Sequence, residues 1–316
     1  MGVVKRVQPK KSDNRLVASH QFMGFGLAIL ATVLFSIKPI FVKLAYQYGV
    51  DSVVLMTLRM LFSLPFYLVI GCWLLMAKQV PLSPLKAELW PCILVGLLGY
   101  YLASYLDLVG LTMVSAQLER IILFIFPTIV VILSRIIYKK PINSKTIGVF
   151  IVTYLGVLLI FSHDFKVSKH DTLAGGIYIF ASAIAFACYI LFSRQRVLNI
   201  GSRMFTCIAM GAASLAIVIH FLLTHQLSDF LVSMPVLSIA AMIAFISTVL
   251  PSFFVSEAIA RLGAEQTSLV STLGPVITAF LAIVILNESF TFYHAIGMAL
   301  VMSGIAWLGL QKSENS

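Results

Sequence analysis

One stretch of this sequence is written twice. Residues 115–156 read SAQLERIILFIFPTIVVILSRIIYKKPINSKTIGVFIVTYLG, and residues 263–304 read GAEQTSLVSTLGPVITAFLAIVILNESFTFYHAIGMALVMSG. When the first copy is shifted by 148 positions, Pro127 coincides with Pro275, Ala116 with Ala264, and Gly156 with Gly304. Each copy has an apolar run of helix length with a proline near its middle, then a polar break and a second apolar run. The repeat predicts a duplicated set of membrane helices, as in transporters built from two halves.

The composition indicates an integral membrane protein. The chain has 316 residues, of which 60% are hydrophobic and 11% charged, and its mean hydropathy is +1.02. A soluble chain has about 45–50% apolar and about 25% charged residues. The net charge of +10 comes from basic residues in short loops between apolar runs, which orient a membrane protein. We therefore expect a lipid bilayer, and no nucleic acid, as the partner of this chain.

The apolar runs predict an all-α membrane protein with ten transmembrane helices. A bilayer-spanning helix needs about 20 predominantly apolar residues. Ten runs approach this length: Phe22–Ala45, Val53–Met76, Leu89–Leu111, Gln117–Ile137, Thr146–Phe161, Leu173–Phe192, Met204–Leu223, Pro235–Ala260, Gln266–Leu286 and Phe292–Leu310. We expect a cytoplasmic basic tail at residues 1–21, a first five-helix repeat at 22–161 and a second at 173–310.

The distribution of basic residues predicts the orientation. With the N-terminus in the cytoplasm, sixteen Lys and Arg residues fall on the cytoplasmic side, and Lys166 and Lys169 alone fall in the outer loops. This asymmetry places both termini in the cytoplasm, because basic loops stay inside. No cleavage site follows the first apolar run, so we expect an uncleaved multi-pass protein of the plasma membrane, which is the inner membrane in bacteria.

An odd number of spans in each half makes the two repeats inverted. The second half then enters the membrane from the side opposite to the first. The loop after the fourth span carries Lys139 and Lys140 and lies inside, whereas its repeat carries Asn287 and Glu288 and lies outside. Charge has thus diverged between the two copies as opposite orientations require. The predicted fold is two inverted five-helix repeats.

The same residues carry a family resemblance. The sequence resembles the EamA-type, ten-helix branch of the drug/metabolite transporter superfamily over 22–310. The matching positions are Arg59-Met60, Tyr105-Leu106, Gly110-Leu111, Ser115-Ala116 and Pro127 in the first half, and Ala258, Ala264, Pro275, Asn287-Glu288, Gly297 and Gly304 in the second. The resemblance implies a secondary carrier of small polar metabolites. Relatives of this kind export amino acids or carry nucleotide-sugars, sugar phosphates or S-adenosylmethionine.

Six charged residues within the predicted spans are candidates for a functional role. They are Lys38, Arg59, Asp107, Glu119, Arg120 and Glu257. A charge at the bilayer centre costs about 2.5–3.5 kcal/mol on insertion scales, so each one calls for a functional role or a partner. Lys38 precedes Pro39, which kinks the helix and frees carbonyl groups. It is interpreted as a contact to substrate, with snorkelling to the interface as the alternative.

The other charges have alternative interpretations. Arg59 is able to clamp a carboxylate or phosphate, but structure or gating is the preferred interpretation. Glu119 and Arg120 point about 100° apart on a helix, so they cannot share one partner. Two ion pairs are plausible, Asp107–Arg120 and Glu119–Arg59, as an outer gate or as permanent packing. Glu257 stands four residues before Arg261, which favours a simple helical ion pair over proton coupling.

Aromatic and hydroxyl side chains complete the predicted substrate-binding or gating set. They are Tyr101, Tyr105, Phe253 and Ser256, and Tyr105 coincides with Phe253 under the shift of 148. Such rings form cavity walls or simple packing. The helix-breaking residues are Pro39, Pro127, Pro251 and Pro275, which a membrane helix tolerates where neighbours satisfy the freed backbone.

The sequence contains no H-E-x-x-H, G-x-S-x-G or P-loop motif, so we expect no enzyme, no cofactor and no metal site. The mixed charges favour a small amphoteric substrate, such as an amino acid, carried by alternating access and exported. A nucleotide-type or S-adenosylmethionine carrier and a non-transporting scaffold or lipid-handling subunit are the alternatives. Coupling to protons or to sodium, and a monomer or a homodimer, are left open.

Overall fold

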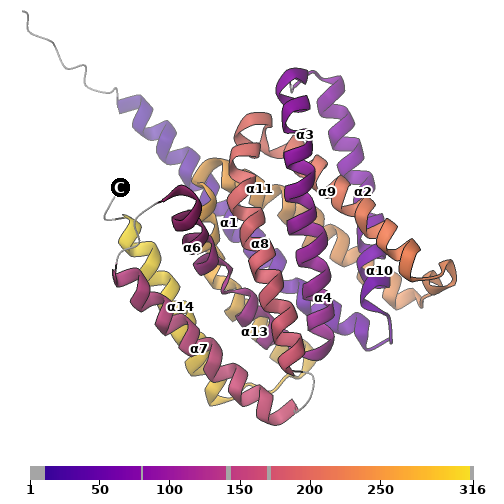
Figure 1. Ribbon diagram of the computed structural model, residues 1–316, viewed down its shortest axis with the longest axis vertical. Helices are drawn as coiled ribbons and strands as arrows, with labels where there is room; N and C mark the ends of the chain where they lie inside the picture. The colour runs from indigo at the N-terminus through magenta and orange to yellow at the C-terminus, as the bar shows by residue number, and fades with distance from the viewer. Residues whose placement is uncertain (1–10, 80, 140–143, 169–171, 314–316) are drawn as a thin grey trace, which may run out of the picture.

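The computed structural model describes residues 11–79, 81–139, 144–168 and 172–313, and these are helical apart from short connections (Figure 1). The first ten residues of the predicted basic tail and Lys140 lie outside the described residues. The remainder of that tail, from Lys11, is helical and begins the first helix.

The helices follow one another in two matching series. The first series contains α1 (Lys11–Tyr46), α2 (Ser52–Met76), α3 (Leu82–Gly96), the π-helical η1 (Leu97–Leu102), α4 (Ala103–Met113), α5 (Ala116–Leu123), α6 (Phe126–Tyr138) and α7 (Ser144–Ser168). The second contains α8 (Thr172–Ile200), α9 (Ser202–Thr224), the 3₁₀ turn η2 (Leu227–Phe230), α10 (Met234–Ala244), the π-helical η3 (Phe245–Val249), α11 (Leu250–Leu262), α12 (Ala264–Val270), the 3₁₀ turn η4 (Ser271–Leu273), α13 (Gly274–Leu286) and α14 (Phe292–Ser313).

The shift of 148 positions also relates local irregularities of the backbone. It carries the first residue of η1, Leu97, onto the first residue of η3, Phe245, so both halves contain a π-helical segment at the same place. It also carries Lys139 onto Asn287, and both residues end their helix in the left-handed conformation with φ of 53°. The duplication in the sequence is therefore a duplication of backbone geometry.

Contacts between the halves follow a two-fold pattern. α1 packs on α11 and α13, and its counterpart α8 packs on α4 and α6. α2 pairs with its own counterpart α9, and α7 with its counterpart α14. In Figure 1 α1 descends from the top of the bundle while α8 ascends from the bottom, as inverted repeats require. The halves thus interlock into one bundle instead of forming two separate domains.

The two ends of the bundle differ in charge. We call the end with the start of α1 and the end of α14, at the top of Figure 1, the basic end. The connections at this end carry basic residues, which include Lys78, Lys86, Arg135, Lys139, Arg196, Arg203 and Arg261. At the opposite end the joints α1–α2, α4–α5 and α13–α14 carry Asp51 and Glu288.

The outer surface of the bundle suits a lipid bilayer. In the described part of the chain, seven helices are long and apolar enough to cross a membrane, and three shorter apolar helices lie within α7, α13 and α14. Large apolar side chains such as Val69, Leu155 and Phe280 are more than half exposed. A soluble protein rarely exposes so much contiguous apolar surface. The protein is an all-helical membrane protein, as predicted.

Glycine allows the closest helix approaches, because helix association in lipid depends on packing by small residues. A Cβ atom at Gly96 would lie 2.5 Å from the backbone of Ala209, where α3 crosses α9. A Cβ atom at Gly156 would lie 2.6 Å from the carbonyl oxygen of Gly297, where α7 crosses α14. These crossings hold the two halves together.

We expect the Gly96→Ala substitution to lower the melting temperature of the purified protein, because the new methyl group collides with backbone that cannot move aside. Such overpacking costs about 1–3 kcal/mol. The matched control is Gly211→Ala on α9, where a Cβ atom meets nothing within 4 Å. That control should stabilise the protein by up to about 1 kcal/mol. Equal melting temperatures for the two variants would contradict this account of the α3–α9 crossing.

Candidate solute-binding site

Two broken helices face each other in the middle of the bundle. The α5–α6 segment is interrupted at Phe124 and Ile125, and the α12–α13 segment at η4. Each break stands just before a proline, Pro127 or Pro275, in the first turn of the following helix, where proline needs no hydrogen-bond partner. Irregular backbone at membrane depth is tolerated where it is buried or lines a cavity. The two breaks therefore point to a cavity between the repeats.

A cavity of about 90 Å³ lies between these segments. It is large enough to hold several water molecules. Helices from both repeats contribute to its wall. The lining includes Ala28, Thr32, Phe35 and Lys38 from α1, Arg59 and Met60 from α2, Tyr100, Ala103, Ser104 and Asp107 from η1 and α4, Arg120 from α5, Ser182, Phe186 and Ile190 from α8, Ser247 and Thr248 from η3, and Thr267 and Ser268 from α12. Spacings of three and four residues place the α1 set and the α8 set each on one helix face.

The charged centre of the cavity is an ion pair between Lys38 Nζ and Asp107 Oδ2. The Asp107 side chain is 2% exposed and that of Lys38 13%, so the pair is shielded from both solvent and lipid. Pro39 lies inside α1 next to the lysine. The Ser36 carbonyl oxygen in this kinked segment accepts a hydrogen bond of 2.9 Å from the Thr278 hydroxyl on α13. The kink therefore joins α1 to the second repeat at the depth of Lys38.

Two arginines line the same cavity. Arg59 Nη2 donates to the Ser104 hydroxyl over 3.0 Å, and Arg120 Nη2 donates to the Ser36 hydroxyl over 3.2 Å. Both arginine side chains are more than nine-tenths buried. The Arg120 guanidinium lies against Gly274 at the start of α13, where a Cβ atom would come within 2.7 Å of it. Gly274 therefore makes the room that Arg120 occupies.

Glu119 stands beside the ion pair without lining the cavity. It is fully buried, and its carboxyl group is within hydrogen-bonding reach of the Asp107 carboxyl group. Lys38 and Arg120 are near enough to act on it electrostatically. Since Glu119 and Arg120 are adjacent on α5, they point in different directions, and Arg120 is the one that faces the cavity.

Several buried polar atoms around the cavity have no hydrogen-bond partner within the described protein. They are Arg59 Nε, Asp107 Oδ1, Arg120 Nε, Ser247 Oγ and both carboxyl oxygens of Glu119. Buried polar groups are normally satisfied by protein or by ordered water. Four of these atoms belong to residues that line the cavity. The wall therefore presents unpartnered hydrogen-bond donors to whatever occupies the space.

The ion pairs expected from the sequence were wrong. Asp107 pairs with Lys38, and neither Asp107–Arg120 nor Glu119–Arg59 forms an ion pair. The reason is the crossing of α1 over α4, which brings Lys38 to the level of Asp107, while each arginine turns to a serine hydroxyl instead. The inward pairing of Lys38 also excludes the alternative that this side chain snorkels to the interface.

Five of the residues predicted to bind or gate lie away from the cavity. Tyr101 and Tyr105 pack on His220 of α9, with ring centroids 5.9 and 4.9 Å apart. Phe253 packs on Tyr67, and Ser256 accepts a hydrogen bond of 2.7 Å from Thr206. Glu257 forms the expected helical ion pair with Arg261, at 2.7 Å, and also accepts from Ser202. A functional role for these five stays a prediction.

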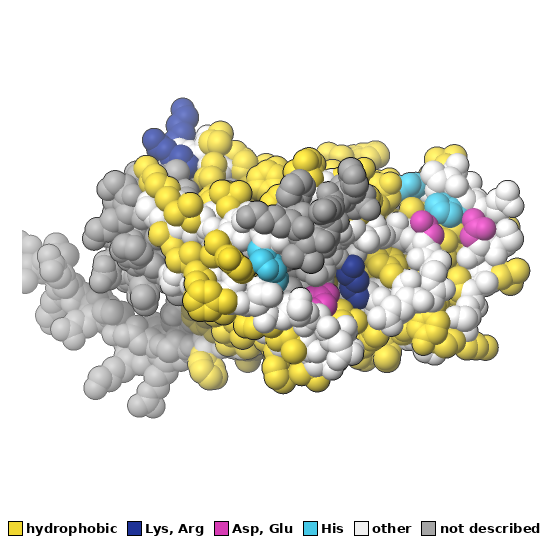
Figure 2. Space-filling view, turned by 90° about the horizontal axis from the view of Figure 1, so that it is seen from below, with side chains coloured by type: hydrophobic (Ala, Val, Ile, Leu, Met, Phe, Trp, Pro, Cys, Tyr) yellow, Lys and Arg dark blue, Asp and Glu magenta, His cyan; other side chains and the backbone are white. Residues whose placement is uncertain are grey.

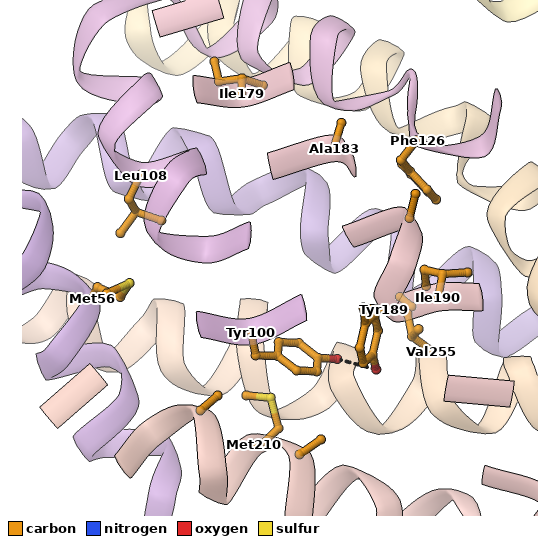
Figure 3. Close-up of a cluster of buried hydrophobic side chains, with 14 of the residues drawn as sticks. Met56, Tyr100, Leu108, Phe126, Ile179, Ala183, Tyr189, Ile190, Met210 and Val255 are labelled. Atoms are coloured by element: carbon orange, nitrogen blue, oxygen red, sulfur yellow. Dashed lines mark hydrogen bonds between the residues drawn. The ribbon is translucent and has the colours of Figure 1, made fainter. Parts of the chain in front are cut away.

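Aromatic side chains that the sequence did not single out enclose the cavity. They are Phe35, Tyr100, Phe124, Phe126 and Phe186. Figure 3 shows the hydroxyl groups of Tyr100 and Tyr189 pointing toward each other, and they are 3.1 Å apart. The four-residue spacing of Ala28 and Thr32, continued by Phe35, is the one signal that could have located part of this wall from the sequence.

Glu288 joins the two repeats at the end opposite to the basic end. Its carboxylate accepts from the backbone N–H groups of Ala116 at 2.8 Å and Gln117 at 3.3 Å, at the start of α5. A carboxylate at a helix N-terminus is favoured by the helix dipole. Figure 2 shows this end of the bundle, where an acidic and a basic side chain lie together near the centre among apolar side chains.

The described residues contain no group of three or more His, Cys, Asp or Glu side chains that could hold a metal ion. The site thus consists of an ion pair, two arginines, hydroxyl groups and aromatic rings. Inverted repeats whose broken helices surround a cavity are an architecture that many membrane transporters share.

The chain belongs to the EamA-like transporter family, whose pattern matches residues 22–162 and again residues 173–310. This confirms the resemblance stated from the sequence. Because the family is one of transporters, it also confirms that the chain is not an enzyme.

Similar proteins extend over nearly the whole chain. The uncharacterized transporter YcbK of Bacillus subtilis (strain 168) is 26% identical over 290 residues, which are 90% of this chain and 92% of YcbK. The uncharacterized transporter sll1319 of Synechocystis sp. is 21% identical and covers 96% of this chain and 98% of its own. A solved crystal structure with 15% identity superposes with a TM-score of 0.65 over 95% of this chain and 99% of the other, which shows the same fold.

We expect Lys38→Met to destabilise the protein, because it leaves the buried Asp107 carboxylate without its cation. Breaking a buried pair in this way costs about 3–5 kcal/mol. Replacing both partners, as Lys38→Met with Asp107→Leu, should restore much of the loss. Melting temperatures of the three proteins in one detergent measure the effect. A buried ion pair would be contradicted if Lys38→Met had the melting temperature of the wild type and the added Asp107→Leu substitution did not raise it.

Proposed function

We propose that the protein is a secondary carrier of a small amphoteric solute, such as an amino acid or a related metabolite, and that it works by alternating access. The observation that carries this proposal is the cavity between the repeats, which presents the Lys38–Asp107 pair together with Arg59 and Arg120. A solute with a carboxylate and an amine complements both signs of charge in this wall.

The arginines suit the carboxylate of such a solute. Lys38 neutralises Asp107, whereas Arg59 and Arg120 make hydrogen bonds to neutral serines and keep their Nε donors unpartnered. Guanidinium groups bind carboxylates through two parallel hydrogen bonds. An amine on the same solute would compete with Lys38 for Asp107. Binding would then exchange an internal ion pair for an ion pair with the solute.

The size and the rings of the cavity favour a small solute with an apolar part. A cavity of about 90 Å³ matches a small amino acid better than a nucleotide. A nucleotide-type or S-adenosylmethionine solute is the second candidate, which the five aromatic rings of the wall favour because they could stack on a base. A non-transporting scaffold has no use for buried unpartnered arginine donors, and it is the least supported alternative.

The charges at the two ends of the bundle support an orientation of the protein in the membrane and a direction of transport. Basic connections favour the cytoplasmic side, so the basic end would face the cytoplasm with both termini. The relatives from Bacillus and Synechocystis are bacterial, which supports the bacterial inner membrane as the location. Glu288 joins the two repeats at the opposite end. We propose that this contact closes the outer end, so that the cavity loads from the cytoplasm and the solute is exported.

Transport by proteoliposomes tests the solute class. Uptake of radiolabelled amino acids should be measurable with the wild type, and Arg120→Lys should raise the KM at least several-fold, because lysine keeps the charge but lacks the guanidinium fork. The control is Arg203→Gln, an exposed arginine at the basic end. Competition of the uptake by sugar phosphates but by no amino acid would contradict the proposed class. If Arg203→Gln also loses uptake, the effect of Arg120→Lys is not specific to the cavity, and a solute contact by Arg120 is contradicted.

Labelling of an introduced cysteine tests alternating access. Ser247→Cys, in a background without the four native cysteines, places a thiol in the cavity wall. Glu288→Gln removes the carboxylate charge from the start of α5 and should increase labelling from the outer face by a membrane-impermeant reagent. The matched control is Asp229→Asn, an exposed carboxylate on η2 at the same end of the bundle. Unchanged labelling in the Glu288 variant would show that this contact does not close the outer end.

A further inference from the structure

The carboxyl group of Glu119 lies behind the cavity wall, beside that of Asp107, and the transport proposal gives it no role. Asp107 on α4 is 2% exposed and Glu119 on α5 is 0% exposed. The two carboxyl groups are within hydrogen-bonding reach of each other. A carboxylate only accepts hydrogen bonds, so this contact forms when one of the two groups carries a proton.

The surroundings determine which group holds the proton. Asp107 Oδ2 is occupied by the Lys38 ammonium, which stabilises the aspartate as an anion. Both Glu119 oxygens lack any donor from the described protein. Two buried carboxylates in contact cannot both be ionised without a large electrostatic cost. The proton therefore belongs on Glu119, where the carboxyl O–H donates to the free oxygen of Asp107.

The charged and titratable groups that face this pair come from three helices. They are Lys38, Lys43 and Tyr46 on α1, Arg59 on α2 and Arg120 on α5. Lys38, next to Asp107, is the only one of them in ion-pair contact with either carboxyl group in the described chain. The ammonium of Lys38 also argues against sodium, because a sodium ion between the carboxylates would have to displace this cation.

We infer that Glu119 and Asp107 form the proton-binding site that couples transport to the proton gradient. This inference rests on the proposed transport function. In the closed state the proton is shared between the two carboxyl groups. When the site opens to water, hydration stabilises the charged form. The O–H bond of Glu119 then breaks, its electron pair stays on the carboxylate, and the proton passes to water.

Lys38 acts on both Asp107 and Glu119, and it therefore links solute binding to proton release. An amine of the solute that reaches Asp107 weakens the hold of Lys38 on this carboxylate. The released ammonium lies close enough to Glu119 to stabilise its ionised form. Solute binding and proton release thereby favour each other, which is the coupling that an exchange of proton for solute requires. The second repeat has Thr267 in place of Glu119, so the proton site exists once per chain.

Infrared spectroscopy of the purified protein in lipid tests the proton site without knowledge of the solute. At neutral pH the wild type should show the C=O stretching band of a buried protonated carboxyl group. The band should disappear in Glu119→Gln. It should also disappear in Asp107→Asn, because the amide supplies a hydrogen-bond donor to Glu119 and lets it ionise. Glu257→Gln should keep the band, since Glu257 already pairs with Arg261.

Three results would overturn the inference. They are a missing band in the wild type, a band that persists in Glu119→Gln, and a band removed by sodium chloride but not by choline chloride. The Asp107→Asn variant carries the test if Glu119→Gln does not fold.

Transport measurements distinguish a failure of this inference from a failure of the proposed function. In proteoliposomes a pH gradient should drive uptake by the wild type, and Glu119→Gln should lose this response while solute exchange continues. A protein with the infrared band but without transport of any amphoteric solute would keep the proton site and refute the proposed function. Transport without a band and without a response to the pH gradient would refute the proton site alone.

Discussion

The ion pair between Lys38 and Asp107 is the interaction on which the interior of this protein depends. Each partner alone would be a charge inside a membrane, which is costly enough that such residues almost always pair or serve function. Because the pair is inside the cavity wall, the hydrogen-bonding groups around it face a space large enough for a small solute. The stability of the interior and the lining of the cavity therefore both depend on one contact, between α1 and α4.

The two repeats contribute unequally to this centre. Backbone irregularities are related by a shift of 148 positions, including the π-helical segments and the left-handed ends at Lys139 and Asn287. The charges are not repeated: Glu119 and Arg120 coincide with Thr267 and Ser268, whose side chains line the cavity as hydroxyl groups. A symmetric scaffold thus surrounds an asymmetric cavity, in which one wall is ionic and the other is neutral.

The sequence was sufficient to predict the scaffold, because hydropathy and repeat spacing are local properties of the chain. The broken helices followed from Pro127 and Pro275, and the pairing of Glu257 with Arg261 followed from helical spacing. Which charges meet across helices could not be predicted, because the rotation of α1 against α4 depends on packing along their whole length. For the same reason Tyr101 was selected although Tyr100, one residue earlier, faces the cavity. Glu288 was recognised in a motif, but its contact with the start of α5 is a contact across 172 positions of the chain.

The central claim is that the cavity between the repeats binds the solute that the protein carries. An experimental structure determined with the amphoteric solute that most raises the melting temperature tests this claim most directly, since a ligand stabilises the state to which it binds. The account predicts density for the solute in the cavity, with its carboxylate at Arg120 or Arg59 and its amine at Asp107. Density at another place on the bundle, with the Lys38–Asp107 pair intact and the cavity filled by water alone, would contradict it.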